Sequence, residues 1–344
     1  MACLRGLRSH ACVAIITLTA VVLVTACSGS ADRSTPLQDA YERVITMDLP
    51  SVVQIDTGKS TGSGVVFDTK GDIVTNAHVV DGAKHYKVID SVAARPLSAR
   101  LVGTFAPDDL AVIRVTSGAK LLPPIRWADS DRARVGQVVV AMGSPLGLTD
   151  SVTQGIISAT GRTVIGPRIA GRSPSVIADA LQTSAAINPG NSGGALAGLS
   201  GAVLGIPTLE ARDPDLSGAA EGIGFAIPSN TVRDIASQLI DKGRVTKSGR
   251  ASLQVTGTTH ATRQGNPDGV AVDAAQRDGA AALAGIKIGD IIIKVGGTRT
   301  RTLAELDDRL IDYKPGEPVR VDVLRGDKHQ RFVVKLGSLS SGPA

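Results

Sequence analysis

Between Leu49 and Pro228 the sequence is a succession of short β-rich runs that Gly and Pro separate. The clearest runs are SVVQI, SGVVF, DIVTN, LAVIRV, QVVVAM, VTQGIIS, ALAGL and AVLGI. No helical patterns alternate with them. Many short strands with frequent turns predict an all-β barrel or sandwich over this stretch.

Composition decides what can fill the core of such a fold. The 344 residues are 42% apolar but only 2% aromatic, so packed cores must be built from Val, Ile, Leu and Ala. The lack of aromatic side chains excludes a nucleic-acid binder that stacks bases on aromatic platforms. The formal net charge of +5 is small and spread along the chain, so charge alone does not indicate DNA, RNA or an acidic partner.

The first 26 residues have the pattern of an export signal, with two arginines, an uncharged apolar stretch and small residues. The apolar stretch, residues 11–26, is shorter than the roughly 20 residues that span a bilayer. The segment around Cys27, VTACS, resembles the lipobox of bacterial lipoproteins. This resemblance implies that Cys27 becomes the first residue and is lipidated, which anchors the chain to a membrane. The alternative is a plain signal peptide with an incidental cysteine.

The remaining chain divides by pattern. A helix is predicted after Thr35-Pro36 and another at roughly 229–242, where apolar residues recur at helical spacing. The predicted organisation is a signal peptide at 1–26, a tether and N-terminal helix at 27–44, a β-rich domain at 45–243, a linker at 244–250, a second domain at 251–337 and a disordered tail at 338–344.

The densest functional signal is the sequence NPGNSGG at 188–194. Its glycines allow a sharp turn and a close approach of backbone N–H groups to a substrate carbonyl. Ser192 could attack that carbonyl, and the N–H groups of Gly190, Asn191 and Ser192 are the candidate oxyanion hole. Taken alone, the motif also fits an ordinary Gly-rich turn.

Two further residues favour a catalytic role for this motif. His78 directly follows a predicted strand, and Asp109 directly precedes one. A lone histidine or aspartate is usually structural, but the order His, Asp, Ser is that of the chymotrypsin-like proteases. In that arrangement Ser192 is the nucleophile, His78 is the general base and Asp109 orients the imidazole. Asp108 is the alternative acid.

The chain resembles the HtrA (Deg) family of serine proteases over residues 45–337. The resemblance rests on the motifs GSGVV, TNAHVV, DDLAVI, GSPLGL, VTQGIIS, AAINPGNSGGAL and GIGFAIPSN. It implies a mostly β fold, in which a chymotrypsin-like double β-barrel precedes a PDZ domain, and a trimer or a multiple of one. It also favours Asp109, because the family's acid immediately precedes a Leu-Ala-Val run. The family commonly has Asp where this chain has Ser184 and Pro where it has Ala195.

Substrate preference follows from the segment upstream of the nucleophile, which lines the S1 pocket in chymotrypsin-like folds. Ala186 and Ile187 lie in this segment, and it carries no charge. A cationic side chain would enter unpaired, at a considerable desolvation cost. The sequence therefore predicts cleavage after small or medium apolar residues.

The C-terminal sequence GIKIGDII (285–292) resembles the PDZ signature. A PDZ domain binds a peptide C-terminus as an added strand beside a helix. The residues expected to line this groove are Leu253, Gln254, Val255, Leu306 and Leu310. Gln254 stands where the family usually has a glycine in its carboxylate-binding loop. The alternative is a packing module without a ligand.

Two functions of different classes follow. The first is an active endopeptidase that cuts unfolded or damaged exported proteins at the bacterial cell envelope, regulated by its PDZ domain, without a metal or other cofactor. The envelope location is the outer face of the plasma membrane or, in a two-membrane cell, the periplasm or outer membrane. The second is a catalytically silent PDZ-bearing chaperone or scaffold. The sequence favours the first because every catalytic position is filled. A processing protease with one dedicated substrate cannot be separated from the first.

Overall fold

The structure is a computed structural model that describes residues 35–90, 96–119, 122–144, 151–166, 175–188, 190–213 and 218–341. The predicted signal peptide, Cys27 and most of the GSPLGL motif lie outside these residues. Helix α2 (Pro36–Asp48) begins where the sequence predicts a helix, because the Thr35 hydroxyl accepts a hydrogen bond from the Gln38 N–H at 3.2 Å. A 3₁₀ turn, η1 (Leu49–Ser51), follows it.

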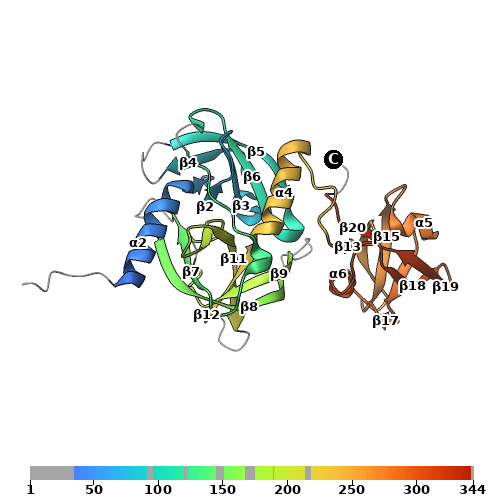
Figure 1. Ribbon diagram of the computed structural model, residues 1–344. Coiled ribbons are helices and arrows are strands. Elements are labelled where there is room, and N and C mark those ends of the chain that lie inside the picture. The colour runs from blue at the N-terminus through green and yellow to red at the C-terminus, as the bar shows by residue number, and fades with distance from the viewer. Residues whose placement is uncertain are drawn as a thin grey trace, which may run out of the picture. The chain divides into compact units, whose positions relative to one another are not determined.

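Six antiparallel strands close the first barrel in the order β1-β2-β3-β6-β5-β4 (Figure 1). They are β1 (Val52–Asp56), β2 (Thr61–Val66), β3 (Asp72–Asn76), β4 (Tyr86–Asp90), β5 (Pro96–Phe105) and β6 (Leu110–Val115). Inward-facing residues fill the interior with aliphatic side chains, among them Val53, Ile55, Ile73 and Ile113. Two short turns flank this sheet and carry functional residues: α3 (Ala77–Val80) follows β3, and η2 (Ala106–Asp108) precedes β6.

The second barrel is closed in the order β10-β11-β12-β9-β8-β7. Its strands are β7 (Val138–Gly143), β8 (Ser151–Ile165), β9 (Val176–Thr183), β10 (Ala195–Gly198), β11 (Val203–Asp213) and β12 (Gly218–Pro228). The turn η4 (Ser130–Arg132) lies before β7. Val139, Leu181 and Leu196 belong to its aliphatic core. Two barrels with cores of Val, Ile, Leu and Ala confirm the predicted mostly β fold.

Helix α4 (Ser229–Lys242) confirms the second predicted helix. Its apolar stripe is buried, and it contacts strands of both barrels, namely β5, β6 and β11. Gly243 ends it with a left-handed φ of 67°, which lets its N–H reach the Leu239 carbonyl at 2.9 Å.

The C-terminal domain is a six-stranded sheet in which β14-β15-β16-β18-β19 are neighbours and β17 pairs with β16. Its strands are β14 (Val255–Ala261), β15 (Pro267–Ala275), β16 (Ile291–Val295), β17 (Thr298–Arg299), β18 (Pro318–Arg325) and β19 (Lys328–Lys335). Two helices accompany it, α5 (Ala280–Ala284) and α6 (Leu303–Leu310). Helix α6 is capped at its N-terminus, where the Thr302 hydroxyl accepts from the Glu305 N–H at 3.1 Å.

The prediction of a disordered tail is wrong as far as residue 341. Strand β20 (Gly337–Ser338) pairs with β13 (Ala251–Ser252). The Leu339 N–H donates to the Arg250 carbonyl at 2.7 Å, and the Ser341 N–H donates to the Val245 carbonyl at 2.8 Å. The predicted linker is therefore hydrogen-bonded to the tail. Both segments are short and polar, so no periodicity in the sequence marks this pairing.

Candidate active site

His78 lies in α3, the single turn that follows β3. Two groups beside it bind the carbonyl oxygen of Asp109: the Asn76 side-chain amide at 3.1 Å and the Ala77 N–H at 3.0 Å. These bonds join the histidine turn to the turn that carries the acid. One side-chain bond and one backbone bond thereby hold together two segments whose key residues, His78 and Asp109, are 31 positions apart in sequence.

Asp109 follows η2 with a left-handed φ of 52°, which is uncommon for a residue with a Cβ. In this conformation its carboxylate accepts from the His78 backbone N–H at 3.0 Å. The two carboxylate oxygens also lie 3.0 and 2.8 Å from His78 Nδ1. With the Nδ1 proton donated to Asp109, the lone pair of the neutral ring is at Nε2, where a general base needs it.

The charge state of His78 follows from this pairing. Burial disfavours the imidazolium, but the hydrogen bond and the negative charge of Asp109 outweigh it and raise the pKa of His78 above its ordinary 6.5. The same carboxylate can therefore stabilise the imidazolium that forms when His78 takes a proton.

Asp108, the alternative acid, has a different partner. Its Oδ1 accepts from Arg250 Nη1 at 2.8 Å, and the same nitrogen donates to the Pro107 carbonyl at 3.1 Å. Asp108 is 3% exposed, and burial raises its pKa although the Arg250 guanidinium opposes this. Of the two neighbouring acids, Asp109 is the one in contact with His78.

Ser192 lies in a loop where the backbone packs too closely for ordinary side chains. Gly193 has a φ of 83°, and a Cβ there would stand 2.2 Å from the Ser63 carbonyl oxygen. A Cβ on Gly194 would stand 2.1 Å from the Met142 carbonyl oxygen. The two glycines of the NSGG sequence are therefore required by close approach of the protein's own backbone, a reason that the sequence analysis did not anticipate.

The predicted oxyanion hole needs one correction. The Asn191 N–H donates to the Asn188 carbonyl at 3.0 Å, so it is engaged within the loop. The Asn191 side chain, in a residue 1% exposed, donates to the Ala186 carbonyl at 3.0 Å. Asn191 thus stabilises the loop through these two hydrogen bonds, and the N–H groups of Gly190 and Ser192 remain the candidate donors to the oxyanion.

Thr208, in β11, is a site residue that the sequence analysis missed. Its hydroxyl donates to Asp109 Oδ2 at 2.5 Å, and its carbonyl oxygen lies 3.5 Å from Ser192 Oγ. One buried residue therefore touches both the acid and the nucleophile. Threonine is common in strands, so nothing in the local sequence distinguishes this one.

The predicted S1 residues lie just before the nucleophile loop. Ile187 is 3% exposed and packs against Gly224, where a Cβ would stand 2.4 Å from Ile187 Cγ1. Ala186 is exposed, and its carbonyl accepts from the Thr153 hydroxyl at 2.8 Å. Ser184, where the family commonly has Asp, accepts the Ile156 N–H at 3.1 Å through its hydroxyl. No charged side chain occurs between residues 182 and 188.

The predicted peptide groove of the C-terminal domain is placed differently from expectation. Leu253, Leu306 and Leu310 are 1%, 3% and 7% exposed and belong to the domain core. They were expected to line a surface groove, but their apolar area is already buried inside the domain. Val255 begins β14, which is the edge strand of this sheet among the described residues, and a PDZ domain adds a peptide strand at such an edge.

Gln254 takes over the backbone conformation for which the family uses glycine. Its φ is 57°, and its N–H donates to the Ser252 hydroxyl at 2.9 Å. Its side-chain amide accepts from the Ala280 N–H at 2.9 Å and donates to the Ser338 carbonyl at 3.2 Å. An N–H in the loop expected to bind a peptide carboxylate is therefore used by the protein itself.

No helix in the described part of the chain is long and apolar enough to cross a bilayer. Within the same residues, no group of three or more His, Cys, Asp or Glu side chains is arranged to hold a metal ion.

Two family models match the chain: a trypsin-like peptidase domain over residues 62–206 and a PDZ domain over residues 245–336. Together with the double barrel, they define a trypsin-like serine protease followed by a PDZ domain. The chain belongs to the HtrA (Deg) family of serine proteases, because it is more than 30% identical to members of that family and the match extends over more than two thirds of their length.

Three relatives illustrate the similarity. The periplasmic pH-dependent serine endoprotease DegQ of Escherichia coli strain K12 is 35% identical over 334 residues, which are 95% of this chain and 70% of DegQ. The serine endoprotease DegS of Salmonella typhimurium is 37% identical over 283 residues, 81% of this chain and 77% of DegS. The crystal structure of the serine endoprotease from Yersinia pestis has a TM-score of 0.56 and 35% identity, and the match covers 87% of this chain and 98% of that one. Relatives named as periplasmic support an envelope location.

Proposed function

We propose that this protein hydrolyses peptide bonds through Ser192, His78 and Asp109. The observation that carries the proposal is the Asp109 carboxylate, which contacts His78 Nδ1 at 2.8 Å and the Thr208 hydroxyl at 2.5 Å. Thr208 in turn approaches Ser192 Oγ through its carbonyl. His78 and Asp109 are thus in direct contact, and Thr208 connects Asp109 with Ser192, which comes from the other barrel.

The mechanism follows from the protonation states. Ser192 Oγ attacks the carbonyl carbon of the scissile bond while its proton passes to His78 Nε2. The negative charge that develops on the carbonyl oxygen is stabilised by the N–H groups of Gly190 and Ser192. When the C–N bond breaks, His78 returns the proton to the leaving amine and an acyl-enzyme remains. Water then attacks the ester, with His78 again taking and returning the proton, and the new carboxylate leaves.

The substrates we propose are unfolded or damaged exported proteins. The uncharged S1 segment with Ala186 and Ile187 supports cleavage after Val, Ala or Leu. Digestion of a peptide library tests this: predominant cleavage after Lys or Arg would refute it. Cys27, outside the described residues, is proposed to anchor the protein by a lipid, and mass spectrometry of the mature N-terminus decides between a diacylglyceryl cysteine and a plain cleaved end. A trimer or a multiple of one is proposed from the family.

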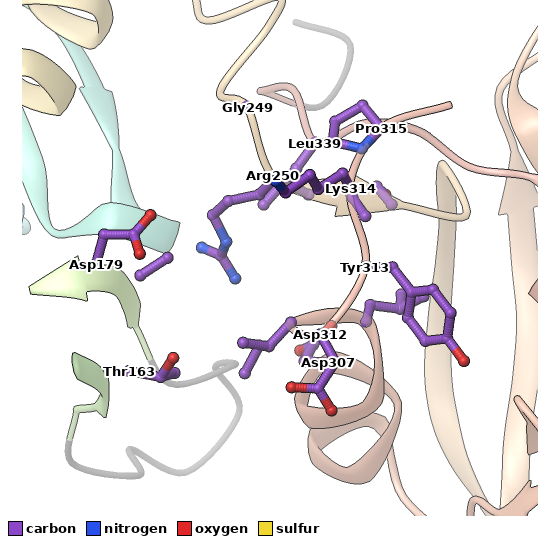
Figure 2. Close-up of a pocket in the computed structure, with 15 residues that line it drawn as sticks. Thr163, Asp179, Gly249, Arg250, Asp307, Asp312, Tyr313, Lys314, Pro315 and Leu339 are labelled. Carbon is purple, nitrogen blue, oxygen red and sulfur yellow. The ribbon is translucent and has the colours of Figure 1, made fainter. Parts of the chain in front are cut away.

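Regulation by the PDZ domain is proposed on the contact between Arg250 and Asp108. Arg250 belongs to the segment that pairs with the tail, and Asp108 directly precedes the catalytic acid. Arg250 also lines a pocket of about 530 Å³, together with Asp179 of β9 and residues of α6 and the segment after it. Figure 2 labels Arg250 and Asp179 among these side chains. A ligand that shifts the C-terminal domain would therefore move a residue that holds the turn of Asp109.

One observation favours the second function, a protein that is catalytically silent at rest. The Ser192 hydroxyl donates to the Thr208 carbonyl at 3.5 Å and not to His78. The hydroxyl proton must turn away from Thr208 before His78 can take it. A scaffold would keep this arrangement, whereas a regulated protease would leave it when substrate binds.

Labelling with a fluorophosphonate probe separates the two functions. We expect labelling of the wild type, increased by unfolded protein or C-terminal peptides, and none of Ser192→Ala. Gel fluorescence and hydrolysis of an unfolded protein are the readouts. Absence of labelling under every condition, with the protein folded, would refute the protease and leave the scaffold.

A further inference from the structure

Ser63 donates both of its hydrogen bonds to the nucleophile loop. It lies in β2 of the first barrel and is 0% exposed. Its N–H donates to the Ser192 carbonyl at 3.0 Å, and its hydroxyl donates to the Gly190 carbonyl through a short hydrogen bond. The nucleophile loop belongs to the second barrel, so these two bonds cross from one barrel to the other.

The hydroxyl of Ser63 is also satisfied as an acceptor. The Ser144 N–H, directly after β7, donates to it at 2.8 Å. A serine hydroxyl has one proton and two lone pairs, so donation to Gly190 and acceptance from Ser144 fix its orientation. Thr75 also fixes the position of Ser63, because its hydroxyl donates to the Ser63 carbonyl at 2.6 Å.

The Gly190 carbonyl, which Ser63 binds, lies along the chain between the two candidate oxyanion donors, the N–H groups of Gly190 and Ser192. The peptide plane that joins Gly190 to Asn191 has its C=O bound by Ser63 and its N–H bound by the Asn188 carbonyl at 3.0 Å. Gly190, at a φ of 125°, has no Cβ to restrict the plane. Without the Ser63 hydroxyl, one of the two bonds that hold this plane is lost.

We propose that Ser63 is a positioning residue that aims the N–H groups of Gly190 and Ser192 at the oxyanion. The inference rests on the proposed protease function. Its contribution appears in the transition state, because oxyanion donors stabilise charge that develops only there. Ser63 lies behind the loop and does not itself touch substrate.

The test compares Ser63→Ala with Ser229→Ala in the full chain. Ser229 is also 0% exposed, and its hydroxyl donates to the Ala128 carbonyl at 2.8 Å, outside the nucleophile loop. Both variants lose one buried serine hydroxyl. We expect kcat on a peptide substrate to fall about 10- to 100-fold in Ser63→Ala, with KM changed less than about twofold, and binding of a peptide boronate to weaken in parallel. Ser229→Ala should keep both quantities within about twofold.

A matched pair keeps the test valid if Ser63→Ala does not fold. Ser63→Thr and Ser63→Val have nearly the same shape and crowd the site equally, but only Thr retains the hydroxyl. We expect the Thr variant to label with fluorophosphonate at least about tenfold faster than the Val variant. Equal rates in the pair, or a Ser63→Ala enzyme with the kcat and boronate affinity of Ser229→Ala, would overturn the role of Ser63. An inactive, unlabelled wild type would instead refute the protease function.

Discussion

Removal of Arg250 should leave the charge of Asp108 buried and unpaired beside Asp109, the proposed catalytic acid. The Arg250 and Asp108 side chains are 16% and 4% exposed, and their atoms are 2.8 Å apart. Removing one partner of a buried pair costs about 3–5 kcal/mol, since the other charge stays without compensation. Because Arg250 retains some exposure, we expect Arg250→Ala to lower the free energy of unfolding by about 3 kcal/mol at pH 8.

The effect should depend on pH in a defined direction. Burial already raises the pKa of Asp108, and loss of the guanidinium raises it further. A carboxyl whose folded pKa lies above its unfolded value stabilises the protein when protonated, and that stabilisation is lost as pH rises through the folded pKa. The difference between the wild type and Arg250→Ala should therefore shrink from pH 8 to about pH 5.

Urea unfolding in a Ser192→Ala background measures this without self-digestion. The single tryptophan, Trp127, reports the unfolding, since its ring lies 5.9 Å from that of Phe67. Arg331→Ala serves as the control, because its partner Asp322 is at 2.6 Å but the Arg331 side chain is 68% exposed, so little change is expected. Adding Asp108→Asn to Arg250→Ala should restore part of the loss. The reasoning is refuted if Arg250→Ala costs under about 1 kcal/mol, or if its cost is the same at both pH values.

Three further predictions concern single groups. Asp109→Asn should lower kcat on a peptide substrate by about 10⁴-fold with KM little changed, whereas Asp108→Asn should retain most activity. A larger loss of kcat in Asp108→Asn than in Asp109→Asn would make Asp108 the acid. The acid limb of the kcat/KM profile should have its midpoint above 6.5, because the negative charge of Asp109 outweighs burial and raises the pKa of His78; a midpoint below 6.5 would contradict this. Burial raises the pKa of Asp48 to about 6 although Arg126 opposes it, so its stabilisation is lost as pH rises through 6. Asp48→Asn should then raise the free energy of unfolding at pH 8, by up to about 3 kcal/mol in urea titrations, and no gain would contradict it.

The agreement between sequence and fold is greatest where local pattern and tertiary need coincide. Strands β3 (DIVTN) and β6 (LAVIRV) are short β-rich runs, buried along nearly their whole length, and were predicted from these runs, and α4 was predicted from one apolar stripe. Strand β5 alternates Ser, Arg and Gly with apolar residues on an exposed surface, so its pattern is weak. The tail is short and has no periodic pattern, and it pairs with a distant segment: Ser252 of β13 is the partner of Gly337, 85 residues later.

The candidate site divides in the same way. His78, Asp109 and Ser192 could be predicted because each lies in a motif whose chemistry constrains the residue type at a fixed place beside a strand or turn. Thr208 and Ser63 are ordinary strand residues in sequence, and their roles come from contacts with loops far along the chain. Leu306 and Leu310 were expected at a peptide groove, but apolar residues on a helix face serve equally well as core, and here they are core.

The sequence by itself determined the class of this protein: β-rich runs with aliphatic cores, His78, Asp109 and Ser192 in the order of chymotrypsin-like proteases, and motifs whose resemblance to the HtrA family implies a double β-barrel and a PDZ domain. These follow from periodicity and from short motifs, which neighbouring residues specify. Only the tertiary structure decided that Asp109 faces His78 while Asp108 faces Arg250, that the Asn191 N–H is engaged, and that Ser63 binds the nucleophile loop. Each of these contacts joins groups that are far apart in the sequence or that differ from a neighbour by one position, so local sequence does not specify the partner. The partner is determined when the barrels close and bring the segments together.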